Sequence, residues 1–167
     1  MAKKEIKDII EIVKKQEKKL RFDKFSNDDA YELGKFMVDK IKKDGIEMAV
    51  QIKRVNGNTL FSYFSEGTNL MNEKWMRRKF NTVVANETSS YLQWAYSELG
   101  GHATDAINAV NLLGLDEMDY VLCGGGFPIK LKTGEMVGVI LASNLPHAKD
   151  HQFIVDGLEG YLKAIKK

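Results

Sequence analysis

The chain has 167 residues, a formal net charge of +2 at pH 7, and 44% hydrophobic residues. This length suits one ordinary hydrophobic core, so we expect a single domain over residues 1–167. The small net charge does not indicate a nucleic-acid partner, and no apolar run approaches the roughly 18 residues that span a bilayer, so no membrane partner is expected either.

Two amphipathic helices are predicted at the start of the chain. In the first, apolar residues recur at helical spacing from Ile6 to Leu20, between charged residues. The second begins after Ser26, a good N-cap that is followed by acidic residues, and ends at Asp44 and Gly45. Each helix is expected to bury one narrow apolar face.

An antiparallel hairpin and a long helix follow. Residues 48–52 and 59–64 flank Asn56-Gly57, a pair suited to a tight turn because both positions tolerate positive φ. Helical spacing of apolar residues then continues over residues 69–99. This pattern predicts one long helix with a kink near residues 86–87.

The rest of the chain is predicted to hold a short helix at residues 104–113, three strands and a final helix. The strands cover residues 120–123, 127–131 and 136–142. The final helix runs from about residue 150 to residue 164, with Asp150 as its N-cap. This order of elements predicts an α/β (α+β) fold, in which a five-stranded, mainly antiparallel sheet packs against helices.

A glycine-rich run from Cys123 to Ile129 is the most unusual part of the sequence. Three consecutive glycines favour positive φ or a close approach of the backbone, yet neither familiar nucleotide-binding glycine pattern is present. Two interpretations are open: a tight bulge without a ligand, or the backbone wall of a small pocket. A second unusual cluster, residues 143–151, holds the only other proline and two of the three histidines. We expect the two clusters to meet in space.

Candidate ligand contacts lie on the predicted long helix. Trp75, Arg78 and Lys79 are spaced to share one helix face, which offers an aromatic plane and two positive charges. Such a face suits a carboxylate-bearing ligand or a neighbouring subunit. A solvated or salt-bridged face explains these residues equally well. Asn72, one turn earlier, would add an amide contact.

The three histidines and the single cysteine allow several possible roles. His147 and His151 are four residues apart, but Pro146 places His147 before the predicted helix, and no metal site is expected. His151 is the candidate general acid or base, because histidine titrates near neutral pH. His102 as a haem ligand has no support in its surroundings. Cys123 is interpreted as a small buried hydrophobe.

Five spaced strings together resemble the GlcG-like, haem-degrading-domain superfamily, and specifically its branch of small proteins of unknown function. They are Asn72-x-x-Trp75-x-x-Arg78-Lys79, Ser89-Ser90-Tyr91, Gly124-Gly125-Gly126-Phe127-Pro128-Ile129, Gly138-Val139-Ile140 and Leu145-Pro146-x-x-x-Asp150-His151. The match covers about residues 20–162. The resemblance implies a profilin-like α/β fold with a five-stranded antiparallel sheet, and assembly into dimers or larger homo-oligomers.

For the site, the resemblance implies pocket membership without catalytic roles. The implied ligand-binding residues are Asn72, Trp75, Arg78, Lys79, Gly124, Gly125, Gly126, Phe127, Pro128, Asp150 and His151. Two positions depart from the family pattern, since Met71 stands where an acidic residue is expected and Asn144 where a glycine is expected. Some relatives bind haem, so haem is a candidate cofactor.

Four functions are open. The leading hypothesis is a cytoplasmic, homo-oligomeric protein that binds a small anionic molecule between the glycine run, the Trp75 helix face and the Asp150–His151 turn. The alternatives are an enzyme that uses His151 as general acid or base, a haem-binding protein, and a scaffold whose motifs serve subunit contacts. The cytoplasmic location fits the single cysteine and an amino terminus without a signal-peptide pattern.

Overall fold

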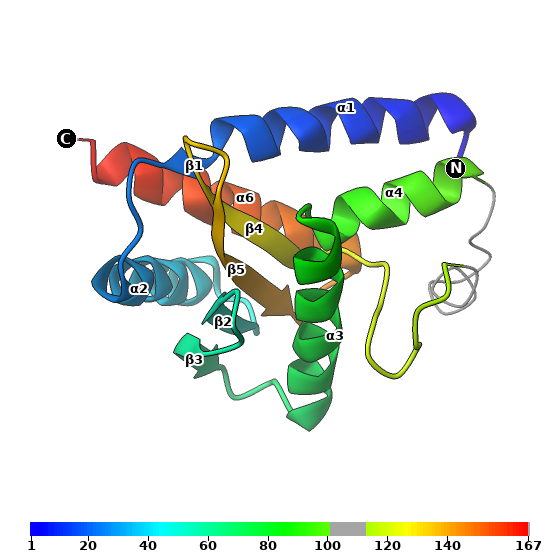
Figure 1. Ribbon diagram of the computed structural model, residues 1–167. Coiled ribbons are helices and arrows are strands. Elements are labelled where there is room, and N and C mark those ends of the chain that lie inside the picture. The colour runs from blue at the N-terminus through cyan, green and yellow to red at the C-terminus, as the bar shows by residue number, and fades with distance from the viewer. Residues whose placement is uncertain (101–112, 167) are drawn as a thin grey trace.

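A five-stranded sheet runs through the computed structural model, which describes residues 1–100 and 113–166. The strands are β1 (Arg21–Phe22), β2 (Ala49–Arg54), β3 (Thr59–Phe64), β4 (Gly126–Leu131) and β5 (Met136–Ser143). They lie in the order β1-β4-β5-β2-β3 (Figure 1). Only β1 pairs in parallel, with β4, and the other neighbours are antiparallel. The expectation of a five-stranded, mainly antiparallel sheet is therefore confirmed.

One predicted strand is wrong, because residues 120–123 form an irregular segment. A helix side chain takes the backbone hydrogen bonds of Val121: Thr82 Oγ1 accepts from Val121 N at 3.2 Å and donates to Val121 O at 2.8 Å. Val121 and Leu122 are nevertheless buried, which explains why their apolar pattern resembled a strand. The fifth strand is instead β1, whose two residues are too few to give a periodic signal.

The helices of the described residues are α1 (Lys3–Lys19), α2 (Asn27–Asp44), α3 (Leu70–Asn86), α4 (Ser90–Gly100) and α6 (His147–Ala164). The predicted caps of α2 are confirmed, since Ser26 Oγ accepts from Asp29 N at 3.1 Å and Gly45 has a φ of 61°. None of these helices has the length and apolar character needed to cross a membrane. The predicted helix at residues 104–113 falls outside the described residues except for its last residue, as does His102.

The long helix predicted over residues 69–99 is in fact two helices. Glu87 takes a left-handed φ of 54° and ends α3. Glu17 of α1 then accepts a hydrogen bond from Ser89 N at 2.8 Å and so caps the start of α4. The predicted bend near residues 86–87 marks this break. Its effect is larger than a kink, because α3 packs on the sheet whereas α4 packs on α1 (Figure 1).

Alternating side chains of the central strands face two separate hydrophobic cores. In β5, Ile140 and Ala142 pack with α2 and α6, whereas Val139 and Leu141 pack beneath α3. This alternation follows from the two-residue period of a strand. The sheet therefore holds α3 on one face and α6 on the other, and both helices reach the end of β5.

The final helix begins earlier than predicted. It starts at His147 with Pro146 as the N-cap residue, so the expected N-cap role of Asp150 is wrong. Asp150 lies in the first turn, where its Oδ1 accepts a hydrogen bond from Leu145 N at 2.9 Å. The carboxylate thus satisfies a backbone donor just before the helix. Its second oxygen points to a partner outside α6.

Candidate ligand pocket

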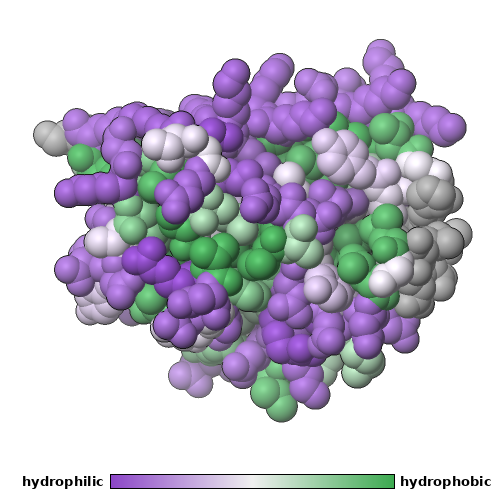
Figure 2. Space-filling view, viewed as in Figure 1, coloured by the Kyte–Doolittle hydropathy of each residue, from purple (hydrophilic) through white to green (hydrophobic). Residues whose placement is uncertain are grey.

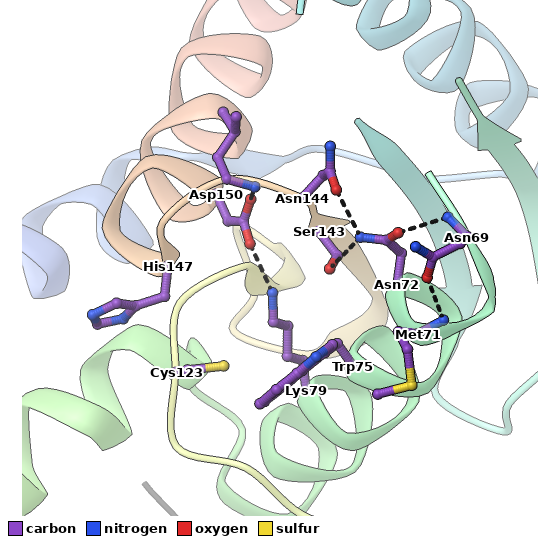
Figure 3. Close-up of a pocket in the computed structure, with 11 residues that line it drawn as sticks. Asn69, Met71, Asn72, Trp75, Lys79, Cys123, Ser143, Asn144, His147 and Asp150 are labelled. Atoms are coloured by element: carbon purple, nitrogen blue, oxygen red, sulfur yellow. Dashed lines mark hydrogen bonds and ion pairs between the residues drawn. The ribbon is translucent and has the colours of Figure 1, made fainter. Parts of the chain in front are cut away.

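A pocket of about 450 Å³ lies where the start of α3, the end of β5 and the start of α6 converge. This volume falls in the range of small-molecule sites. The lining combines amides, a hydroxyl, an ion pair and apolar side chains (Figure 3). The lining residues are Asn69, Met71, Asn72, Trp75, Lys79, Cys123, Ser143, Asn144, Leu145, His147 and Asp150.

A buried ion pair, here called the floor of the pocket, joins α3 to α6. Lys79 Nζ lies 2.9 Å from Asp150 Oδ2 and also donates to Ala142 O at 2.9 Å. Figure 3 shows the two charged side chains pointing toward one another, and each is only 3% exposed. Burial raises the pKa of Asp150, although the charge of Lys79 and the hydrogen bonds to the carboxylate oppose this rise. A pair with so little exposure is tolerated only because each charge has close partners.

The glycine run lies directly against this floor. A Cβ at Gly124 would overlap His147 O, and one at Gly125 would overlap Ala142 O and Lys79 Nζ. Gly125 also has a φ of 108°, which other residues rarely adopt. Ala142 N donates to Gly125 O at 2.8 Å. The predicted meeting of the two unusual clusters is therefore confirmed, and close backbone approach explains the glycines.

An amide network orders the wall of the pocket at the end of β5. Asn72 Nδ2 donates to Ser143 Oγ at 3.2 Å and to Asn144 Oδ1 at 3.3 Å, while Asn72 Oδ1 accepts from Asn69 N at 2.8 Å. Asn144 Nδ2 donates in turn to Glu47 O at 3.1 Å. Asn144 has a φ of 148°, a conformation that favours glycine. The asparagine thus occupies a glycine-like turn and adds an amide to the pocket.

Two further pocket residues, His147 and Cys123, carry no charge near neutral pH. His147 Nδ1 accepts a hydrogen bond from Gly124 N at 3.2 Å, so the proton of the neutral ring lies on Nε2. Burial and the nearby charge of Lys79 lower the pKa of His147. Its ring packs edge-on against Trp94, with 4.7 Å between the centroids. Burial also raises the pKa of the Cys123 thiol, which therefore stays protonated.

The predicted site residues do not all lie in the pocket. Four line the pocket, namely Asn72, Trp75, Lys79 and Asp150. Gly124, Gly125 and Gly126 pack around the floor, whereas Phe127 and Pro128 are buried within β4. Arg78 turns away, since its Nε donates to Tyr120 O at 3.2 Å and its guanidinium lies 4.9 Å from the centroid of the Trp75 ring. Their part in ligand binding stays a prediction.

His151 faces a different cavity, of about 220 Å³, beneath α1. Its side chain is buried, its Nε2 lies 2.9 Å from Gln16 Oε1, and within the described residues its Nδ1 has no hydrogen-bond partner. The ring packs against Tyr91 at 4.7 Å between centroids. Burial lowers the pKa of His151 to about 4. A side chain with this pKa is a poor general base at neutral pH, so the buried position of His151 does not favour the enzyme hypothesis.

Sequence reasoning did not assign several lining residues to the site: Asn69, Met71, Cys123, Ser143, Asn144, Leu145 and His147. The last four fall in the cluster at residues 143–151, so that cluster as a whole was the available signal. Asn69 carried the signal of a helix N-cap, and its Oδ1 does accept from Met71 N at 2.9 Å. In residues 1–100 and 113–166, no three His, Cys, Asp or Glu side chains are grouped to hold a metal ion.

Comparisons with known proteins find relatives along most of the chain. Residues 25–159 match a family model described as haem degrading protein HbpS-like. A UPF0303 protein of Psychromonas ingrahamii is 34% identical over 152 residues, which cover 91% of this chain and 92% of that protein. These two similarities extend over the strands and helices that build the pocket.

Two solved structures are similar in fold. The crystal structure of Ybr137w protein gives a TM-score of 0.85 at 23% identity, over 95% of this chain and 90% of that chain. The crystal structure of a PduOC:heme complex gives a TM-score of 0.64 at 17% identity, over 82% of this chain and 94% of that chain. At these identities the likeness shows a common fold.

Proposed function

We propose that this chain, which belongs to the HbpS-like haem-degrading family and to the UPF0303 family of unknown function, binds a small anionic molecule. The proposal rests on the pocket. The observation that carries the proposal is the Lys79 ammonium at the floor of a pocket with otherwise uncharged donors. Met71 and Trp75 supply an apolar wall for the rest of the ligand. Pockets of this kind, apolar with a few convergent polar groups, are typical of ligand sites.

The hydrogen-bond donors of the pocket suit a ligand that carries a hydrogen-bond acceptor. Ser143 Oγ accepts from Asn72, and among the described residues its own hydroxyl proton goes to no acceptor. Together with the ammonium of Lys79, it offers a charged and a neutral donor to the same pocket. Charge-assisted hydrogen bonds of this kind hold carboxylates and similar anions. The protonated thiol of Cys123 is a weak nucleophile, so binding is favoured over covalent catalysis.

A melting-temperature screen tests this proposal with formate, acetate, benzoate, chloride, sulfate and inorganic phosphate. We expect at least one anion to raise the melting temperature of the wild type, because a ligand that binds only the folded state stabilises it. Ser143→Ala should need several-fold more of the same anion. The matched control is Ser97→Ala, which removes a buried hydroxyl from α4, outside the pocket. Absence of any shift, or an unchanged response of Ser143→Ala, would contradict the proposal.

Haem is the second candidate ligand, because of the family description and the PduOC:heme neighbour. Iron is held by a histidine lone pair, a thiolate, a methionine or a tyrosinate. Here Gly124 N occupies the lone pair of His147 Nδ1, and Cys123 is a thiol. Met71 is exposed on α3. The pocket residues in this arrangement therefore do not fit iron ligation by His147 or Cys123.

A hemin titration followed at the Soret band examines this candidate. We expect no spectral change that depends on His147, so His147→Ala and the wild type should give the same titration curve. A Soret band that forms with the wild type and disappears in His147→Ala would show that the ring gives up Gly124 to hold iron. That result would restore haem as the leading ligand of this pocket.

We further propose that the protein is a cytoplasmic homo-oligomer. Apolar side chains are exposed next to the pocket, on Phe64 at the end of β3 and on Leu70 and Met71 at the start of α3. Figure 2 shows hydrophobic surface at this end of α3. Exposed apolar clusters often mark contact surfaces.

Light scattering during gel filtration measures the mass of the assembly. We expect a dimer or larger, and a smaller mass for Met71→Glu. Met118→Glu is the matched control, since Met118 is also an exposed methionine but is not part of this cluster. A monomer at every concentration would contradict self-association. An assembly that binds none of the anions would instead be a scaffold.

A further inference from the structure

Lys79, at the floor of the pocket, has one N–H donor that no acceptor in the described residues takes. A lysine ammonium has three N–H donors. Two of those on Lys79 go to Asp150 Oδ2 and Ala142 O, each at 2.9 Å. Within residues 1–100 and 113–166, no acceptor is bonded to the third. Since Lys79 lines the pocket, an acceptor atom of a ligand can take this donor.

An anion bonded to Lys79 also lies close to Asp150. Acceptors around an ammonium are spread at roughly tetrahedral angles, so two that each lie about 2.9 Å from Nζ are about 4.7 Å apart. The side chain of Asp150 is 3% exposed, and water therefore screens the repulsion poorly. The incoming anion and the Asp150 carboxylate would share a single positive charge.

Among the described residues, the groups bonded to Asp150 include no second positive charge. The groups that face it are Lys79 from α3, Cys123 from the loop before β4, His147 from α6 itself, and the backbone N–H groups of Asn144 and Leu145. A lowered pKa of His147 and a raised pKa of Cys123 keep both side chains uncharged. Arg78, which precedes Lys79 on α3, donates instead to the carbonyl of Tyr120.

We propose that an anion enters this pocket together with one proton, which Asp150 takes up as the anion bonds to Lys79. The inference rests on the proposed function, because it concerns the same pocket and the same ligand. The proton comes from solvent, Asp150 becomes a neutral carboxylic acid, and Lys79 keeps its charge. One positive charge then faces one negative charge. The preferred ligand class is therefore a monoanion such as a monocarboxylate, because a second negative charge would have no partner.

The proposal sets the direction of the pH dependence. Burial already raises the pKa of Asp150, and a bound anion raises it further. Between the pKa of Asp150 in the unliganded protein and its pKa in the complex, each anion binds with one proton. Within that window the Kd increases about tenfold for each unit of pH. Acidic solution therefore tightens binding.

Calorimetry on the wild type measures the Kd and the number of protons taken up. The probes are formate, acetate and benzoate as monoanions and sulfate as a dianion, from pH 5.5 to pH 8, in two buffers that differ in their heat of ionisation. We expect a monocarboxylate to bind more tightly at lower pH and to take up one proton, and sulfate to bind at least tenfold more weakly. Equal Kd values across this range together with equal heats in the two buffers would overturn the inference.

Two variants assign the proton to its group. Asp150→Asn should bind the monocarboxylate with a Kd that no longer depends on pH. Asp119→Asn removes an exposed carboxylate that pairs with Arg77, and it should keep the wild-type pH dependence. If Asp150→Asn does not fold, the number of protons that the wild type takes up on binding tests the inference: one proton supports it, and none contradicts it. Binding without pH dependence removes only this inference, whereas failure of all three monocarboxylates to bind removes the proposed function as well.

Discussion

Asp150 and His151 are adjacent in the chain but lie in two different cavities. Successive residues of a helix point about 100° apart, so Asp150 faces the pocket beneath α3 and His151 faces the cavity beneath α1. Asp150 pairs with Lys79 and with a backbone N–H. The His151 side chain has one hydrogen-bond partner, Gln16, in the described residues.

The difference shows two ways in which a fold accommodates a buried titratable group. At the pocket, a partner of opposite charge allows the charge to stay. Beneath α1, no such partner is present among the described residues, and burial lowers the pKa of His151 to about 4 so that the ring stays neutral. Anion binding is therefore expected at the first cavity and not at the second.

Loss of Lys79 should have the largest effect, because it leaves Asp150 buried without a counter-charge. We expect Lys79→Met to reduce the free energy of unfolding by about 3 to 5 kcal/mol at pH 7. The loss should be smaller at pH 5, where protonation of Asp150 relieves it. The double variant Lys79→Met/Asp150→Leu should regain most of the stability. Urea denaturation measures these free energies. A loss under about 1 kcal/mol for Lys79→Met would show that Lys79 and Asp150 are not energetically coupled.

His151 should make the protein sensitive to acid. Its pKa is about 4 in the folded chain and about 6.5 when unfolded, so the unfolded state binds the proton first as the pH falls. The free energy of unfolding should therefore drop by about 3 kcal/mol between pH 6.5 and pH 4 from this residue alone. His151→Leu should lack that part of the drop. Identical pH profiles for the two proteins would show that burial does not control this side chain.

Replacement of Gly125 by alanine should destabilise the protein more than the same replacement at a glycine with similar backbone geometry. Gly125→Ala should cost about 2 to 3 kcal/mol, because its φ is 108° and the Cβ would overlap Ala142 O. Gly134 has a φ of 100° and nothing near its Cβ position, so Gly134→Ala should cost only about 1 kcal/mol. Thermal unfolding of the two variants separates backbone strain from overlap. Equal costs would mean that close packing at the floor is unimportant.

The smallest effect is expected beneath α1. Gln16→Ala removes the partner of His151 Nε2 and should cost about 1 kcal/mol in the free energy of unfolding, the usual value of one hydrogen bond. Gln93→Ala is a suitable control, since Gln93 makes a single side-chain hydrogen bond to Thr88 on the same segment. A cost for Gln16→Ala as large as that of Lys79→Met would erase the distinction between the two cavities.

The sequence predicted the elements with strong periodicity and failed where tertiary contacts decided. The stripe of α1, the caps of α2 and the hairpin at Gly57 follow from local chemistry, and all are present. Residues 120–123 carry the apolar pattern of a strand, but Thr82 bonds the backbone N–H and carbonyl of Val121. No local signal reveals such a competitor. The same limit explains the missed strand β1, which exists only by pairing with β4.

The site was predicted as one group, and the structure separates that group. Equal helical spacing placed Arg78 beside Lys79, yet a carbonyl at Tyr120 draws Arg78 away while Asp150 holds Lys79. The partners of these cations lie 42 and 71 residues away in the chain. Spacing within a helix cannot predict contacts at such separations. It predicts a shared face, and long-range partners then decide which side chains remain at the pocket.

The first helix has a consequence for where this protein can be divided. The family match spans residues 25–159 and so leaves out α1, although α1 caps α4 through Glu17 and covers Tyr91 and Leu92 with its apolar stripe. A chain trimmed to the matched residues would expose that apolar face of α4 to water and leave Ser89 N without its carboxylate. Such a fragment would tend to aggregate. The bounds of the family model therefore leave out a helix that the packing of α4 requires.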